Sequence, residues 1–286
     1  MRSLLVLPQV GGVAEPPIEM TRFASPAHPM RPSKSAKFAG CPMSTILSMW
    51  AEDKGNASAQ TGNLIHDAVE AFHKTKDARV EAGLKALADA RVQFPDGDPK
   101  KAEKVFRAYA ADPENVLADV RYVEEPVSLW LAPAPEDKTG QPVVIEGTLD
   151  QVRVMPEDAN GDWWVWDVKT GDRFTAEETA TEYLIQQAVY MLAANQMLDS
   201  RIKRCGVIYT PNYEKNRGKR FVPLPLSLET AILLIAPLVH WVAQVRAGIM
   251  QFRPSVDSCA FCPVKPWPKC INVARTAFGS SILQGV

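Results

Sequence analysis

The sequence predicts an α/β fold with a mixed central sheet flanked by helices. Short apolar runs with alternating side chains indicate strands at about 117–131, 142–155, 162–169, 204–210 and 219–225. Helical periodicity indicates a helix at 177–198, between the third and fourth strands, and another at 228–249, after the last strand. With 286 residues, of which 46% are hydrophobic, the chain is long enough to bury the core of one large domain.

In the N-terminal third of the sequence, the pattern indicates an arm and then helices that precede the sheet. The first 35 residues are rich in Pro and Gly and lack periodicity, so we expect an extended arm over residues 1–36. The apolar run Leu4–Leu7 is too short for a signal-peptide core or a membrane span, and we therefore expect a cytoplasmic protein. A helix is expected from Gly62 to His73 with Asn63 as a possible N-cap, followed by a helical insertion at 78–111.

Two acids and a lysine fall on a predicted pair of strands. Asp167 and Lys169 project from the same face, because residues two apart on a strand share a side. The turn-forming stretch between Val154 and Trp163 predicts an antiparallel hairpin, which brings Asp150 close to Asp167. Paired carboxylates repel unless a cation lies between them, and oxygen ligands favour Mg²⁺ or Mn²⁺. Taken alone, however, an Asp-x-Lys tripeptide is more often a surface ion pair.

Two helical patterns, one on each side of this hairpin, carry further candidates. His66 lies at the border of the apolar side of its helix, where a neutral imidazole can reach a metal; a hydrogen-bonded core histidine is the ordinary alternative. His73 lies two turns further on, and we expect it to be exposed. Gln186 and Tyr190 are four residues apart on one helix face, so both can point at the acids, although helix packing alone gives the same spacing.

The order of these motifs resembles the RecB-like branch of the PD-(D/E)XK nucleases, which includes CRISPR-associated adaptation exonucleases and AddB-type helicase-nucleases. In that family a Cys-Pro opens the domain, and Gly-x-x-x-His, Gly-x-x-Asp, acid-x-Lys and Gln-x-x-x-Tyr follow. The corresponding residues here are Cys41-Pro42, Gly62 through His66, Gly147 through Asp150, Asp167-Val168-Lys169, and Gln186 with Tyr190. The resemblance covers roughly residues 37–273 and implies a restriction-endonuclease-like core.

The resemblance also implies a metal-dependent DNA exonuclease that acts in recombination, repair or end processing. It assigns the ligands of one or two Mg²⁺ or Mn²⁺ ions to His66, Asp150, Asp167 and the Val168 carbonyl. Lys169 would orient or deprotonate the attacking water, and the sequence leaves both roles open. Gln186 and Tyr190 would position the lysine and the DNA backbone.

Four of the five cysteines lie at the two ends of the matched span: Cys41, Cys259, Cys262 and Cys270. This layout resembles that of iron–sulfur members of the family, in which a [4Fe-4S] cluster fixes a C-terminal segment, here 255–273, to the start of the domain. Thiolates bind zinc as well, so a zinc site stays open, and seven residues separate Cys262 from Cys270, more than in the family pattern. Disulfides are not expected without a secretion signal, and Cys205 is expected to be a buried strand residue.

The charge of the chain limits how it can bind nucleic acid. A formal net charge of -1 excludes a general nucleic-acid coating protein, so DNA contacts are expected from local patches. The candidate patches are Arg201, Lys203 and Arg204, and then Lys215, Arg217, Lys219 and Arg220. No Gly-rich phosphate-binding loop is present, which excludes an ATP-driven motor in this chain. We expect DNA ends as the substrate, recombination, single-strand-binding or CRISPR adaptation proteins as partners, and no membrane.

Several alternatives stay open at this point. The chain could be a non-cleaving DNA-binding module of a recombination or CRISPR adaptation complex, or a zinc-stapled structural protein whose acids are incidental. Glu124 and Glu125 can assist the site, but as edge charges we expect them to be structural. A stand-alone phage exonuclease is expected at least as readily as a CRISPR-associated one, in a bacterial, archaeal or phage-infected cell. The expected limits are an arm at 1–36, the nuclease domain at 37–273 and a tail at 274–286.

Overall fold

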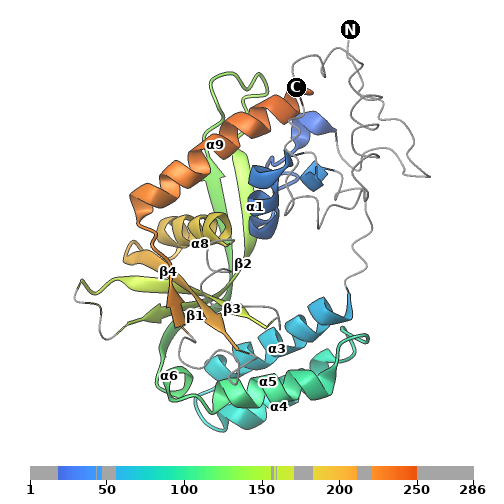
Figure 1. Ribbon diagram of the computed structural model, residues 1–286, viewed down its shortest axis with the longest axis vertical. Helices are drawn as coiled ribbons and strands as arrows, with labels where there is room; N and C mark the ends of the chain where they lie inside the picture. Colours follow the sequence, from blue (N-terminus) through green and yellow to red (C-terminus); the bar gives the residue numbers. More distant parts are fainter. Residues whose placement is uncertain are drawn as a thin grey trace. The chain divides into compact units, whose positions relative to one another are not determined.

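The computed structural model describes residues 19–42, 44–46, 56–155, 158, 160–170, 183–210 and 221–249 (Figure 1). These residues form a mixed five-stranded sheet with flanking helices, which confirms the predicted α/β class. The cysteine-rich segment at 255–273 and most of the predicted arm lie outside the described residues.

Most of the described helices precede the sheet, and one joins two of its strands. The helices are η1 (Met20–Arg22), α1 (Pro32–Gly40), α3 (Ala57–Lys74), α4 (Arg79–Ala90), α5 (Pro99–Ala110), α6 (Pro113–Val116), α8 (Leu184–Met197) and α9 (Leu228–Arg246). The strands are β1 (Asp119–Leu131), β2 (Val143–Val154), β3 (Trp163–Lys169), β4 (Ile202–Tyr209) and β5 (Phe221–Pro223). All five strands fall within the predicted ranges to within a few residues.

The sheet is mixed because its neighbouring strands pair in both directions. The strand order is β1-β2-β3-β4-β5. β2 and β3 pair antiparallel, with Gln151 opposite Trp166, as the turn-forming residues between them predict. β3 and β4 are parallel, and α8 lies between them in the chain, as a parallel pair requires a crossover. β5 returns antiparallel to β4. The hairpin places Asp150 and Asp167 next to the last residue pair that joins β2 to β3.

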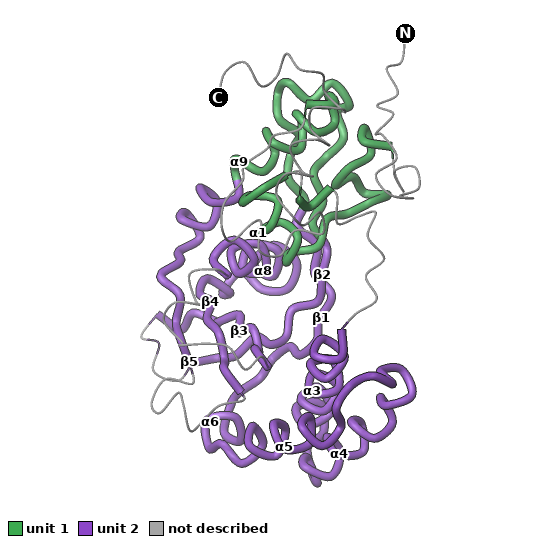
Figure 2. Tube along the Cα trace, turned by 45° about the vertical axis from the view of Figure 1, so that its right-hand side comes forward, with its two compact units in different colours: residues 1–53, 130–145, 236–286 green, residues 54–129, 146–235 purple. Residues whose placement is uncertain are grey.

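The chain forms two compact units (Figure 2). Unit 1 comprises residues 1–53, 130–145 and 236–286, and unit 2 comprises residues 54–129 and 146–235. β1, β2 and α9 each run from one unit into the other. Apart from the cysteines, every residue of the predicted site belongs to unit 2.

The core of unit 2 lies between the sheet and helices α3, α4 and α5. Trp166 and Val168 of β3 and Ile208 of β4 pack there in one cluster with buried apolar side chains of the three helices. Because successive residues on a strand face opposite sides, Asp167 and Lys169 face away from this core. One side of β3 is therefore apolar and packed, and the other carries the charged groups.

Helix α3 begins earlier than predicted. Its N-cap is Asn56, whose side chain accepts a hydrogen bond from the Ala59 N–H at 2.8 Å. Asn63 lies inside the helix, so the prediction of Asn63 as the N-cap was wrong. The first turn consists of small and polar residues that show no apolar periodicity, which is why the pattern indicated a later start.

The expectation that His73 is exposed was also wrong. His73 is partly buried, with Nε2 2.6 Å from the Tyr109 hydroxyl and Nδ1 3.1 Å from a nitrogen of Arg79. Burial, reinforced by the charges of Arg153 and Arg79, lowers the pKa of His73 to about 3. The partners come from α4, α5 and β2, so periodicity along α3 alone does not reveal them.

A glycine allows β3 and β4 to pair closely. Gly206 lies opposite Trp166 in the parallel ladder, and a Cβ atom at Gly206 would lie 2.3 Å from the indole ring. Trp166 also stacks on Trp164, with the ring centroids 5.5 Å apart, and is almost completely buried. Gly206 therefore leaves the space in which Trp166 sits, one residue before Asp167.

The buried side chain of Arg246 organises unit 1. Its guanidinium donates a hydrogen bond to the Asp137 carboxylate at 2.7 Å. The remaining donors bind the backbone carbonyl oxygens of Phe23, Ala24, Gln141 and Pro142. A buried guanidinium is tolerated because its charge is paired and its donors are used.

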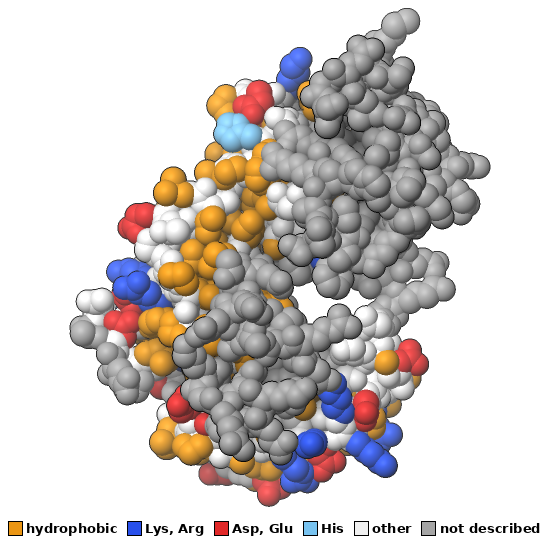
Figure 3. Space-filling model, in the orientation of Figure 1, with side chains coloured by type: hydrophobic (Ala, Val, Ile, Leu, Met, Phe, Trp, Pro, Cys, Tyr) orange, Lys and Arg blue, Asp and Glu red, His pale blue; other side chains and the backbone are white. Residues whose placement is uncertain are grey.

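Among the described helices, α9 is long and apolar enough to cross a membrane by length and composition alone. Its residues Ala231, Ile235 and Val242 are buried, whereas Ile232 and Leu233 are exposed. Figure 3 shows hydrophobic side chains gathered along this helix. The core helix of a soluble protein meets the same criteria, so α9 is insufficient evidence for a membrane protein.

We expect Gly206→Ala to lower the free energy of unfolding by about 1–3 kcal/mol, because the added methyl group overpacks against Trp166. Urea denaturation measures the loss. In a Trp166→Leu background, which removes the ring, the same substitution should cost less. Equal losses in both backgrounds would show that the ring is not what Gly206 accommodates.

Candidate active site

The predicted acids lie where the pairing of β2 with β3 ends. That pairing reaches Gln151 opposite Trp166, and Asp150 Oδ2 then accepts a hydrogen bond from the Val168 N–H at 2.5 Å. A strand residue directs its N–H and its C=O toward the same neighbouring strand. The Val168 carbonyl therefore faces the side on which Asp150 lies, so two groups predicted as metal ligands share one edge of β3.

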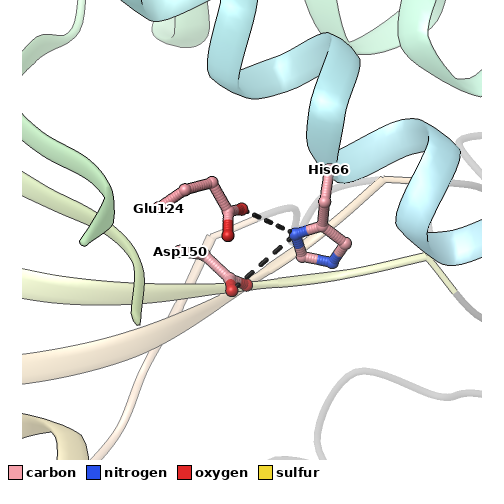
Figure 4. Close-up of side chains that lie close together, drawn as sticks. All are labelled: His66, Glu124 and Asp150. Carbon is pink, nitrogen blue, oxygen red and sulfur yellow. Dashed lines mark hydrogen bonds and ion pairs between the residues drawn. The ribbon is translucent and has the colours of Figure 1, made fainter. Parts of the chain in front are cut away.

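A histidine and two carboxylates converge beside this edge (Figure 4). His66 Nδ1 on α3 lies 3.0 Å from Glu124 Oε1 on β1 and 3.7 Å from Asp150 Oδ1 on β2. One possible ligand atom from each of the three residues lies within 4.8 Å of the other two. An imidazole nitrogen and two carboxylates at this spacing can bind one divalent cation.

Asp167 and Lys169 form an ion pair next to this cluster. Lys169 Nζ lies 2.6 Å from Asp167 Oδ2, and Gln186 Nε2 donates a long hydrogen bond of 3.4 Å to Asp167 Oδ1. In the structure the Asp167 carboxylate is thus turned toward Lys169 and α8, and its role as a metal ligand stays a prediction.

The charges of the site act strongly on one another. Burial works against a charged imidazole, but Asp150, Glu124 and Asp167 outweigh it and raise the pKa of His66 to about 9. Burial, only partly offset by His66, raises the pKa of the Asp150 carboxyl well above its usual range. The carboxylates therefore attract positive charge, and without a metal the proton on His66 supplies it.

Helix α8 brings the two predicted polar residues to the acids. Gln186 and Tyr190 are both largely buried. Burial, together with the negative charges of Asp150 and Asp167, raises the pKa of Tyr190. Tyr190 therefore stays a neutral phenol beside the acids, able both to donate and to accept a hydrogen bond.

Gly62 allows α3 to approach the end of β3. A Cβ atom at Gly62 would lie 3.1 Å from Thr170 Oγ1, which is closer than most real Cβ contacts. His66 follows about one helical turn later and lies on the same side of α3. A glycine at the first position of the Gly-x-x-x-His pattern thus lets α3 pack closely against the end of β3. This close packing brings His66 to the acids.

The sequence was compared with models of known protein families. The model of the PD-(D/E)XK nuclease superfamily matches residues 30–267. The chain belongs to this superfamily. Membership implies a metal-dependent nuclease with DNA as its substrate. A comparison with curated proteins finds no match.

The candidate site contains Glu124, which was expected to be structural. Glu124 has a φ of +48°, in the left-handed region, which costs a non-glycine residue about 1–3 kcal/mol. Strain of this kind concentrates at functional sites. The sequence signal was the pair Glu124-Glu125, because adjacent residues on a strand face opposite sides and one of the two must face inward.

Of the five cysteines of this PD-(D/E)XK nuclease, two belong to the described residues. Cys41 is buried after the end of α1, whereas Cys259, Cys262 and Cys270 lie outside the described residues. Cys205 is fully buried on β4, which confirms its expected place.

The first basic patch is paired with acids rather than free for DNA. Arg201 binds Asp199 at 2.6 Å, and Asp162 lies 3.5 Å from Arg204 and 3.9 Å from Lys203. Phosphate contacts here would have to compete with these carboxylates. The second patch, at 215–220, lies outside the described residues.

We expect the Mn²⁺ affinity of the nuclease to rise about tenfold per pH unit between about pH 7 and 9, and more steeply below pH 7, where the Asp150 carboxyl also holds a proton that the metal must displace. The raised pKa of His66 means that metal binding must release its proton, and this cost disappears above about pH 9. Isothermal titration calorimetry at several pH values measures the slope. His66→Gln should bind Mn²⁺ more weakly and with a flatter pH dependence. A wild-type affinity that is independent of pH would contradict the assignment of His66 as a ligand.

Proposed function

We propose that the protein is a metal-dependent DNA exonuclease of the RecB-like branch, which processes DNA ends in recombination or repair. The observation that carries the proposal is the convergence of His66, Glu124 and Asp150 beside the Asp167–Lys169 pair, in a chain of the nuclease superfamily. The RecB-like branch is supported by the order of the motifs and by the two helices, α3 and α8, that bring a histidine and a Gln-x-x-x-Tyr pair to the acids.

The donor set favours a hard divalent cation, Mg²⁺ or Mn²⁺. His66, Glu124 and Asp150 offer one imidazole nitrogen and carboxylate oxygens, and the negative charges that raise the pKa of His66 would also favour a cation beside it. We infer that Asp167 and the Val168 carbonyl complete the ligand set. When bound, the cation supplies Lewis acidity that polarises the scissile phosphate and acidifies water.

Lys169 acts as an ammonium group in this proposal. Burial disfavours its charge, but Asp167 and Asp150 outweigh burial and raise the pKa of Lys169 above its usual value. An amine that holds its proton this firmly orients water and phosphate oxygen by donating hydrogen bonds rather than by removing a proton. Tyr190 and Gln186 hold the acids and the DNA backbone in place around it.

We further propose that Cys41, Cys259, Cys262 and Cys270 bind one structural [4Fe-4S] cluster, with zinc as the alternative. The support for a ligand role is the place of Cys41 directly before Pro42, at the start of the proposed domain, together with the late trio of cysteines. In this proposal the nuclease domain spans 37–273, α4 and α5 form its helical insertion, and the cluster lies in the segment 255–273.

The proposed setting is the cytoplasm of a bacterial, archaeal or phage-infected cell. The chain would act on single-stranded or duplex DNA ends beside recombination, single-strand-binding or CRISPR adaptation proteins. A stand-alone phage enzyme fits the sequence as well as a CRISPR-associated one.

We expect purified protein with Mn²⁺ to degrade linear DNA from its ends and to leave covalently closed circles intact, and EDTA to abolish cleavage. Lys169→Ala and Asp150→Asn should each reduce the rate by at least about a hundredfold, since each removes charge stabilisation at the reacting phosphate. Lys85→Ala, which removes an exposed lysine of α4, is the matched control and should cut normally. End-labelled single-stranded and duplex substrates report polarity and strand preference.

Two outcomes of this assay would contradict the proposed function. Wild-type activity in Lys169→Ala or Asp150→Asn would show that cleavage comes from elsewhere. Tight DNA binding without cleavage under any metal condition would indicate the non-cleaving DNA-binding module instead.

We expect protein purified without oxygen to be brown and to contain iron and sulfide in equal amounts. Cys41→Ala should lose the iron, unfold at a lower temperature and cut poorly, because the cluster stabilises the fold rather than the chemistry. Cys205→Ala, which removes the buried cysteine of β4, is the control and should keep its iron. Zinc without iron would favour the zinc alternative, and a Cys41→Ala protein that folds and cuts normally would exclude both.

A further inference from the structure

Among the described residues, the ammonium group of Lys169 lies against a carboxylate and an aromatic ring. One is Asp167 Oδ2 at 2.6 Å, and the other is the aromatic ring of Tyr183, whose centroid lies 4.2 Å from Nζ. A cation this close to a ring face is attracted by the ring quadrupole. The Lys169 side chain is only 20% exposed, so water weakens this attraction less than it would at an open surface.

Tyr183 extends the polar face of α8 by one turn. It is the N-cap residue of the helix, and Tyr183, Gln186 and Tyr190 are spaced three and four residues apart. Side chains at this spacing line one face of a helix. Along that face, the Tyr183 ring contacts Lys169 and the Gln186 amide contacts Asp167. The position of Tyr183 is thus set by the same helix that places the two predicted polar residues.

We propose that Tyr183 is a positioning residue that holds Lys169 in place during cleavage; this rests on the proposed nuclease function. Asp167 alone would hold the lysine poorly in the active state. If Asp167 holds a divalent cation, as proposed above, that positive charge would weaken the attraction between the carboxylate and the ammonium and would also repel the ammonium. The face of the Tyr183 ring carries no net charge, so its attraction for the ammonium persists.

The same contact indicates that the ring of Tyr183 is the part that positions Lys169. Lysine has a flexible four-carbon stem, and restricting it to one arrangement raises the fraction of time in which its donors are correctly placed. The contact joins the Lys169 ammonium to the aromatic ring of Tyr183. A phenylalanine should therefore replace Tyr183, whereas a leucine of similar bulk without a ring should not.

The test compares Tyr183→Phe with Tyr183→Leu in steady-state cleavage by the full chain with Mn²⁺. We expect Tyr183→Phe to keep kcat within about twofold of the wild type, and Tyr183→Leu to lose about tenfold, equivalent to about 1.4 kcal/mol in the activation barrier. KM for DNA and the Mn²⁺ affinity should not change. Leu184→Ala, at the same turn of α8, controls for loosening of the helix and should keep kcat.

Nuclear magnetic resonance supplies a readout that does not depend on activity. The ring should shift the ε-methylene protons of Lys169 upfield, and this shift should persist in Tyr183→Phe and vanish in Tyr183→Leu. A Lys169→Arg spectrum assigns the signal. Absence of the shift in the wild type, unchanged kcat in Tyr183→Leu, or equal losses in the two variants would each overturn the positioning role.

The two proposals fail in different ways. If the wild type cleaves no DNA while the upfield shift is present, the proposed function is wrong and the catalytic role of Tyr183 falls with it. If the wild type cleaves and the shift is absent, only the role of Tyr183 is wrong.

Discussion

The carboxylate of Asp150 is the group on which the rest of the site depends. It accepts the Val168 N–H where the β2–β3 pairing ends, and it faces the imidazole of His66. One side chain thus binds the last part of β3 and also belongs to the charged cluster. A buried carboxylate is costly unless positive charge accompanies it. The fold satisfies Asp150 with a backbone donor and a histidine, and this leaves a place that a divalent cation can take over.

One side of β3 packs in the apolar core, and the other side carries the charged residues of the site. Trp166 and Val168 anchor the strand in the apolar core beneath α3, α4 and α5, while Asp167 and Lys169 face α8. A functional site is held in place only when its supporting elements are rigid. Here the support comes from close approach: Gly206 accommodates the Trp166 ring, and Gly62 lets α3 reach the end of β3.

The sequence could predict the elements of this site because they depend on local rules. Alternation along Trp166–Lys169 predicted one apolar and one charged side, and the turn before Trp163 predicted the hairpin that brings Asp150 near Asp167. The helical spacing of Gln186 and Tyr190 likewise predicted a shared face. These parts of the site follow from residues close together in the chain.

The parts that could not be predicted depend on contacts between distant segments. Glu124 joins His66 through a left-handed backbone conformation in the middle of a strand, which no propensity of glutamate indicates. His73 is drawn into a buried network by partners on other elements, and the first turn of α3 lacks the apolar residues that mark a helix start. In each case tertiary contacts, not local pattern, decide the outcome.

The most direct test of the account is the location of the metal. Crystals of the protein soaked in Mn²⁺ and measured at the manganese absorption edge should show an anomalous peak bonded to His66 Nδ1 and to the carboxylates of Asp150 and Glu124. A peak at another place, or no peak in the cluster at a Mn²⁺ concentration that supports cleavage, would contradict the claim that this group of residues is the metal centre.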